Sequence, residues 1–102
     1  MNKIFNLIGL ATRAGKIVFG TDAVLKNLGK KQTHIIFVAS DASDATIDKV
    51  EKKAFFYNIK VIKKYSTEEL AKSTGRSNPK VIGLNDLGFS KAIFSELERI
   101  GD

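Results

Sequence analysis

The stretch "HIIFVAS", residues 34–40, decides the fold, because it is a continuous apolar run rich in branched side chains. Such a run is typical of a strand that is buried on both faces, whereas a half-buried strand alternates apolar and polar residues. The run "KVIGL", residues 80–84, has the same character and predicts another central strand. Two weaker strands are expected at "KIVF", residues 16–19, and "IKVIKK", residues 59–64.

Helical patterns alternate with these strands along the chain. The first two are expected at residues 3–14 and 21–28, and the third is expected to begin after Ser43 or Asp44. A short fourth helix is opened by a capping box of Ser66 and Glu69. Apolar residues at helical spacing mark the inner faces of the third helix and of a final one: Ile47, Val50, Ala54 and Tyr57, and then Phe89, Ile93, Leu97 and Ile100.

This alternation predicts an α/β fold, a three-layer α/β/α sandwich around a small mixed, mostly buried sheet. The chain has 102 residues, which is enough for one core, and we expect a single domain over residues 1–102. The N-terminal apolar stretch is too short to span a membrane, and no signal peptide is evident. The sequence therefore predicts a small cytoplasmic domain.

The charge balance is basic, with 17 Lys and Arg against 11 Asp and Glu and a net charge of +6. A basic surface attracts polyanions such as nucleic acids, although it also serves solubility. Cysteine is absent, which excludes disulfides and thiolate metal sites and fits a reducing cytoplasm.

Signals for catalysis are weak. His34 is the only histidine, and it opens a buried strand, so a structural role is favoured. The hydroxyls and carboxylates that follow the 34–40 run are also the residues that turns and helix caps use: Ser40, Asp41, Ser43 and Asp44. A hydrolase built on Asp41 and Asp44 would need a metal or a detectable turnover. We expect no enzyme, no cofactor and no metal.

The stretch "GTDAVLK", residues 20–26, allows two interpretations. In the first, Thr21 caps a helix, Asp22 complements the helix dipole and Asp22 pairs with Lys26 at the surface. In the second, the free N–H groups of the helix start bind an acceptor, and Gly20 lets that ligand approach the backbone. From these residues alone the first interpretation is favoured.

A second loop, "STGRSNPKV" at residues 73–81, also allows two interpretations. It is either a helix C-cap followed by a turn that ends at Pro79, or a flexible loop whose Arg76 and backbone reach a phosphate or an unstacked base.

The order of these motifs resembles a known family. "RAGKI" followed by "GTDAVLK", with "LAKSTGRSNP" before an apolar strand, is similar to the ribosomal protein superfamily that binds kink-turn RNA, with the large-subunit proteins seven-A-e and thirty-e among its members. The stretch "LNDLGF" resembles the bacterial YlxQ-like branch. The resemblance covers nearly the whole chain. It implies the same sandwich fold, no catalysis, and recognition of a sharp RNA bend built on tandem sheared G·A pairs.

The resemblance also implies the RNA-binding residues. Those that would meet the guanines, the nearby backbone and an extruded nucleotide are Lys16, Gly20, Thr21, Asp22, Lys26, Gly75, Arg76, Ser77 and Asn78. RNA-binding members commonly have Asn and then Glu where this chain has Asp22 and Ala23. An ionised Asp can only accept hydrogen bonds, for instance from guanine N1–H, and Ala offers no polar group.

Two hypotheses on function follow. The first is a cytoplasmic, ribosome-associated RNA-binding protein, with a kink-turn or related structured RNA, ribosomal RNA included, as its partner. The second is a protein-interaction module on the same fold, with ribosomal or other protein partners and lost or weak RNA recognition, which Asp22 and Ala23 would explain. Neither hypothesis involves a membrane.

Overall fold

The computed structural model describes residues 2–101, so both end residues of the domain predicted for 1–102 lie outside the described residues. Along this part of the chain the elements follow in the order α1 (Lys3–Arg13), β1 (Ile17–Phe19), α2 (Thr21–Leu28), β2 (Ile35–Val38), α3 (Asp44–Phe56), β3 (Lys60–Ile62), α4 (Thr67–Thr74), β4 (Val81–Leu84) and α5 (Leu87–Arg99).

The strands form one mixed sheet in the order β1-β4-β2-β3. Strand β4 pairs antiparallel with both β1 and β2, and β3 pairs parallel with β2. The two apolar runs that predicted central strands are β2 and β4, and every residue of both strands is buried. The prediction of a small mixed sheet with a buried centre is confirmed.

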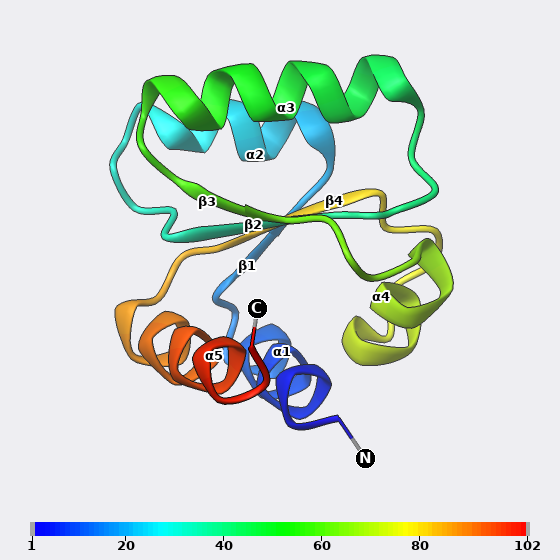
Figure 1. Ribbon diagram of the computed structural model, residues 1–102, viewed down its shortest axis with the longest axis vertical. Coiled ribbons are helices and arrows are strands. Elements are labelled where there is room, and N and C mark those ends of the chain that lie inside the picture. The colour runs from blue at the N-terminus through cyan, green and yellow to red at the C-terminus, as the bar shows by residue number, and fades with distance from the viewer. Residues whose placement is uncertain (1, 102) are drawn as a thin grey trace.

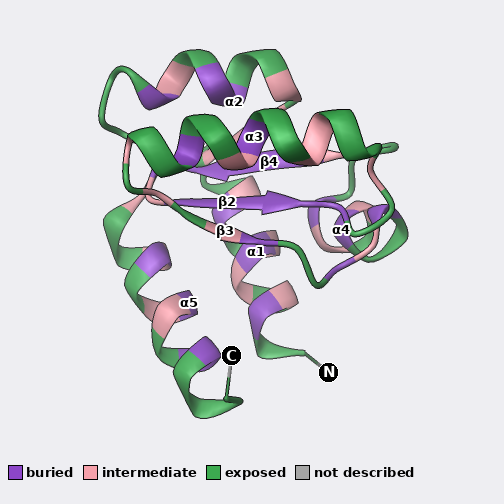
Figure 2. Cartoon of the chain, turned by 45° about the horizontal axis from the view of Figure 1, so that its top comes forward, coloured by how far each residue is buried: buried purple, intermediate pink, exposed green. Residues whose placement is uncertain are grey.

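Helices cover both faces of this sheet. Figure 1 shows α2 and α3 on one face and α1, α4 and α5 on the other. Side chains alternate along β2, so Ile35 and Phe37 join the core under α1 and α5, whereas Ile36 and Val38 join the core under α2 and α3. Figure 2 shows the buried central strands between helices whose outer surfaces are exposed. The predicted three-layer sandwich is therefore confirmed.

Side chains cap the starts of α3, α4 and α5. The Ser43 side chain accepts a hydrogen bond from the Thr46 N–H at the start of α3, and Ser66 with Glu69 forms the predicted capping box of α4. Helix α5 is capped by Asp86, which sequence analysis did not single out. Among the described residues, no helix combines the length and the apolar character that crossing a membrane requires.

Two expected inner-face residues lie beyond their helices. Helix α3 ends at Phe56 and α5 ends at Arg99, so Tyr57 and Ile100 are C-cap residues. Tyr57 is partly buried, but Ile100 is 42% exposed and does not line the core. Local spacing did not reveal this, because it does not show where the core under a helix ends.

Helix α2 packs closely on β4 at Gly83. A Cβ atom at this position would lie 3.3 Å from both the Thr33 methyl carbon and a Val24 methyl carbon. Such contacts are tighter than ordinary van der Waals packing, so the missing side chain at Gly83 sets how near α2 comes to the sheet.

We predict that Gly83→Val lowers the free energy of unfolding by about 1–3 kcal/mol, because the added methyl groups overpack the space under Val24. Urea denaturation followed by circular dichroism measures this. Gly29→Ala is the matched control: Gly29 has a φ of −64°, and its added Cβ would lie 3.6 Å from the Tyr57 hydroxyl oxygen. Its stability should stay the same or rise by up to about 1 kcal/mol. Wild-type stability for Gly83→Val would contradict the packing argument.

Candidate nucleic-acid interface

The end of β1 and the start of β4 meet at Gly20 and Val81. The Gly20 N–H donates a hydrogen bond to the Val81 carbonyl oxygen over 2.9 Å, next to the register pair of Phe19 and Ile82. In an antiparallel pair, the segment that leaves one strand lies beside the segment that enters the other. The start of α2 and the loop of residues 75–80 are therefore neighbours, although they are far apart in the sequence.

Between these two segments lies a hollow of about 540 Å³. Its lining residues are Phe19, Gly20, Thr21, Arg76, Ser77, Asn78, Pro79 and Lys80. The structure thus brings Gly20 and Thr21 of the helix start together with three predicted residues of the late loop: Arg76, Ser77 and Asn78. Asp22, Lys26 and Gly75 do not line this hollow. Gly75 precedes this lining as the left-handed C-cap of α4, with a φ of 73°.

The start of α2 is capped by backbone alone, which corrects the expectation that Thr21 is the cap. Gly20 is the N-cap, at a φ of 95° that favours glycine, and no side chain there makes a capping hydrogen bond. Thr21 is the first helical residue. Within the described residues, the N–H groups of Thr21, Asp22 and Ala23 donate to no protein acceptor. The helix therefore presents free donors at its positive end.

Asp22 and Lys26 extend from the same helix but do not pair with each other. The Asp22 carboxylate is 98% exposed and pairs with Lys49 of α3 at an N–O distance of 3.8 Å, which corrects the expected Asp22–Lys26 pair. Lys26 is exposed one turn further along α2. This exposed pair adds little stability, so the side chains of Asp22, Lys26 and Lys49 can all turn to a ligand.

On the other side of the hollow, Arg76 lies over the ring of Phe19. The distance from the guanidinium carbon to the ring centroid is 4.2 Å, which is a cation–π geometry. Residues 75–78 are exposed and Pro79 is buried, so the loop is anchored at one end and open along its length. Sequence analysis missed Phe19 as a site residue; its position directly before Gly20 is the signal that could have found it.

Asp41 contacts the end of the same loop through Thr67 and Lys80. Its Oδ1 accepts hydrogen bonds from the Thr67 N–H and the Thr67 hydroxyl, each over 2.8 Å. The Lys80 ammonium donates to the Thr67 hydroxyl oxygen over 2.9 Å and lies 4.0 Å from Asp41 Oδ2. These hydrogen bonds from Thr67, the backbone one first, lower the pKa of Asp41 below its ordinary value of 3.8, and the charge of Lys80 acts in the same direction.

The polar cluster after β2 thus has structural partners. Asp41 holds the start of α4, Ser43 caps α3, and Asp44 is the first residue of α3. The Ser40 N–H donates to the Tyr65 carbonyl oxygen, and the His34 N–H donates to the Leu84 carbonyl oxygen. Among residues 2–101, no three His, Cys, Asp or Glu side chains gather in a way that could hold a metal ion.

Lys16 is not brought to the hollow. Its carbonyl oxygen accepts a hydrogen bond from the Asn85 N–H, at the end of β4 that is opposite to Val81. Lys16 and Gly20 lie at the two ends of β1, about 13 Å apart along an extended chain. Any RNA contact of Lys16 would therefore have to lie outside the hollow.

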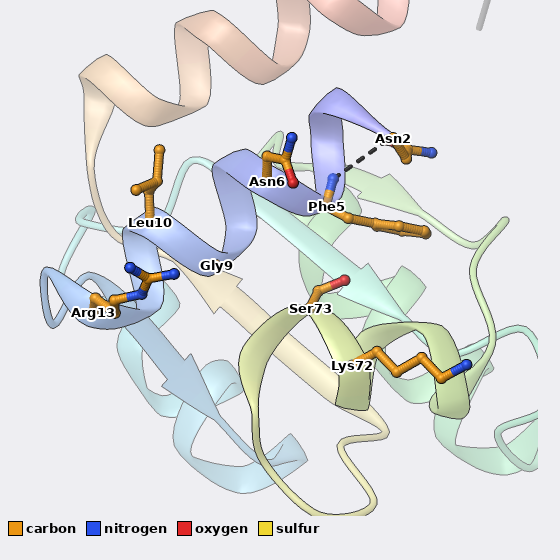
Figure 3. A pocket seen from close by; sticks show the side chains of 8 residues that line it. All are labelled: Asn2, Phe5, Asn6, Gly9, Leu10, Arg13, Lys72 and Ser73. Carbon is orange, nitrogen blue, oxygen red and sulfur yellow. Dashed lines mark hydrogen bonds between the residues drawn. The ribbon is translucent and has the colours of Figure 1, made fainter.

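A larger hollow of about 660 Å³ lies between α1 and α4 (Figure 3). It is lined by Asn2, Phe5, Asn6, Gly9, Leu10, Arg13, Lys72 and Ser73. The helices approach closely at Gly9, where a Cβ would lie 3.1 Å from the Ser73 carbonyl oxygen. None of the predicted site residues lines this hollow, so it does not coincide with the predicted site.

Known proteins resemble this chain in sequence. A sequence model of the ribosomal protein L7Ae/L30e/S12e/Gadd45 family matches residues 2–91. A protein named RNA-binding protein YlxQ from Enterococcus faecium is 38% identical over 87% of this chain and 85% of its own length. A protein of the same name from Bacillus subtilis is 34% identical over 92% of this chain and 94% of its own length.

Two solved structures share the fold. A Bacillus halodurans protein of unknown function superposes with a TM-score of 0.91 and 30% identity, over 96% of this chain and 99% of that one. The Giardia lamblia 15.5kD RNA binding protein superposes with a TM-score of 0.81 over 95% of this chain and 83% of that one. At 14% identity, the second likeness shows the fold alone.

The lowered pKa of Asp41 predicts a pH-dependent stability. A carboxyl group with a lower pKa in the folded state stabilises the fold above its unfolded pKa, and this contribution is lost as the pH falls through the folded pKa. Asp41→Asn should therefore be less stable than the wild type at pH 7, with the difference shrinking below about pH 4. Urea denaturation at several pH values measures it. A difference that stays constant down to pH 2 would contradict the assignment.

Proposed function

This chain belongs to the ribosomal protein L7Ae/L30e/S12e/Gadd45 family, and from that premise we propose that it recognises a kink-turn or a related bulged RNA. The observation that supports this most is the meeting of the α2 start and residues 76–80 around one hollow. The chain is not an enzyme, in agreement with relatives that are named RNA-binding proteins. We further propose that it acts in the cytoplasm on ribosomal RNA or another structured RNA.

The start of α2 supplies the chemistry for distorted RNA. Free N–H groups at the positive end of a helix suit phosphate oxygens and the acceptor edge of a guanine. Gly20 has open space where a side chain would lie, so a base or phosphate can come close to the backbone. Regular A-form RNA hides its major groove, whereas a kinked element opens it to a helix.

The late loop supplies a cover for an unstacked nucleotide. Arg76 lies with its guanidinium over Phe19, which leaves the opposite guanidinium face free for a base. Ser77 and Asn78 are exposed and offer a hydroxyl and an amide on the same rim. An extruded nucleotide between this loop and the α2 start would meet polar groups on both sides.

Asp22 and Ala23 tune this recognition. The exposed Asp22 carboxylate can accept from guanine N1–H or N2–H₂, but it cannot donate to guanine O6. One good base contact is worth about 1–3 kcal/mol of discrimination. We therefore propose that this chain binds kink-turns more weakly than relatives with Asn and Glu at these positions.

We predict that the protein binds a kink-turn RNA at least about tenfold more tightly than a control RNA whose G·A pairs are replaced by Watson–Crick pairs, since only the first presents an opened groove. A salt-titrated fluorescence anisotropy assay measures both affinities. Equal, strongly salt-dependent binding to both RNAs would mean that the basic charge gives generic attraction only. A protein partner that persists after nuclease treatment would then favour the protein-interaction module.

We predict that Lys26→Ala and Arg76→Ala each reduce the slope of log affinity against log salt concentration by up to about one unit, because each removes a positive charge that would lie next to an RNA phosphate. Lys72→Ala is the matched control: Lys72 lies on α4 across the sheet and pairs with Glu68 at 3.6 Å. If the control lowers the slope as much as the two site variants do, the assigned surface is wrong.

Asp22→Asn should tighten kink-turn binding by about tenfold, since it removes a negative charge that faces the RNA and adds an amide donor for guanine O6. The same anisotropy assay measures it. Weaker binding of Asp22→Asn would show that the carboxylate itself makes the contact.

A further inference from the structure

Helices α2 and α3 lie side by side and run in the same direction (Figure 1). Two pairs of neighbouring residues show how the two helices align. Asp22 at the start of α2 pairs with Lys49 near the middle of α3, and a Cβ at Gly29 would lie 3.6 Å from the Tyr57 hydroxyl oxygen at the ends of the two helices. With this alignment, the exposed Lys26 of α2 lies alongside Lys53 of α3.

Helix α3 has an unusual outer surface. Lys49, Lys53 and Phe56 are spaced so that they share one face of the helix, and we call them the α3 strip. They line a hollow of about 450 Å³ together with Lys52 and Tyr57. Phe56 is 79% exposed, and its ring packs edge to face on Tyr57 with the ring centroids 5.1 Å apart. This large aromatic ring therefore belongs to the surface and not to the core.

Among the described residues, Lys53 is the lysine of the α3 strip whose charge is uncompensated, whereas the neighbouring Lys52 pairs with Asp48 over 3.0 Å. In the part of the chain that the structure describes, Lys53 has no carboxylate within ion-pair distance, and Lys49 reaches Asp22 only at 3.8 Å. Lys30 and Lys31 directly follow α2 near the Phe56 end, and both are exposed. The strip therefore joins positive charge to one stacking surface over a length of about 10 Å.

We propose that the α3 strip binds unpaired RNA that continues from the kink-turn, with Lys49 and Lys53 on phosphates and Phe56 stacked on a base. The proposal rests on the proposed function, because the strip begins at the Asp22–Lys49 pair, directly beside the α2 start. The centres of protein–protein interfaces are depleted of lysine, whereas three lysines line this hollow beside Phe56 and Tyr57. A nucleotide matches this surface, because its base can stack on an aromatic ring and its phosphate carries a negative charge.

The test compares a kink-turn RNA with closed stems and the same RNA with an unpaired extension of about eight nucleotides, placed on each strand end in turn. For the wild type, one extension should raise the affinity by about tenfold. Phe56→Ala should abolish most of this gain and leave the affinity for the closed RNA unchanged. Lys53→Ala should lower the salt slope only for the extended RNA.

Phe55→Ala is the matched control, since Phe55 is 88% exposed but lies about 100° around the helix and does not line the hollow. It should keep the full gain. An equal affinity for closed and extended RNA, or an equal loss in Phe55→Ala and Phe56→Ala, would overturn the proposal while kink-turn binding stands. If binding of the extended RNA does not depend on the G·A pairs but still requires Phe56, the result would support RNA binding by the α3 strip and contradict the proposed function.

Discussion

The hydrogen bond from the Gly20 N–H to the Val81 carbonyl oxygen is the contact on which the candidate interface depends. It closes the antiparallel pairing of β1 with β4, and it places the α2 start beside the loop that enters β4. Strand β4 holds this contact in place because it is an interior strand that is buried on both faces and pairs on both sides. A site made of two chain segments thus acquires a rigid common base.

The two segments of the interface, the α2 start and the late loop, differ in how firmly they are held. The α2 start is fixed by the sheet and by the close packing of Val24 on Gly83. The late loop is held at its ends, where Gly75 ends α4 and the Asp41–Thr67–Lys80 network joins α4 to β4, while Arg76 rests on Phe19. This arrangement suits recognition in which a preformed helix end meets the RNA and a loop then closes over a nucleotide.

Much of the fold could be predicted from the sequence because it depends on local patterns. Two apolar runs without alternation identify the strands β2 and β4, and the Ser66 and Glu69 pair identifies the start of α4. The sequence could not show that Gly20 caps α2, because backbone capping leaves no side-chain signature. Nor could it show that Asp22 meets Lys49, since that pair depends on how α3 crosses the sheet beside α2.

For the candidate site, too, local sequence motifs predicted some features, whereas others depend on the tertiary structure. The motif order pointed to residues 20–26 and 75–78, and the strand register explains why most of them meet. Lys16 belongs to the same motif but lies at the other end of β1. The exposure of Phe56 was not predicted, although the residue lies outside the inner face that Val50 and Ala54 mark on the same helix.

The most direct test of one interface built from two segments is an amide chemical-shift titration of the labelled protein with kink-turn RNA. Our account predicts that the amides of Gly20–Asp22 and of Gly75–Asn78 shift together, at the same RNA concentration. It also predicts that these shifts require at least about tenfold more RNA when the G·A pairs are replaced by Watson–Crick pairs. Shifts confined to one segment, or spread over lysine-rich surfaces regardless of the G·A pairs, would contradict it.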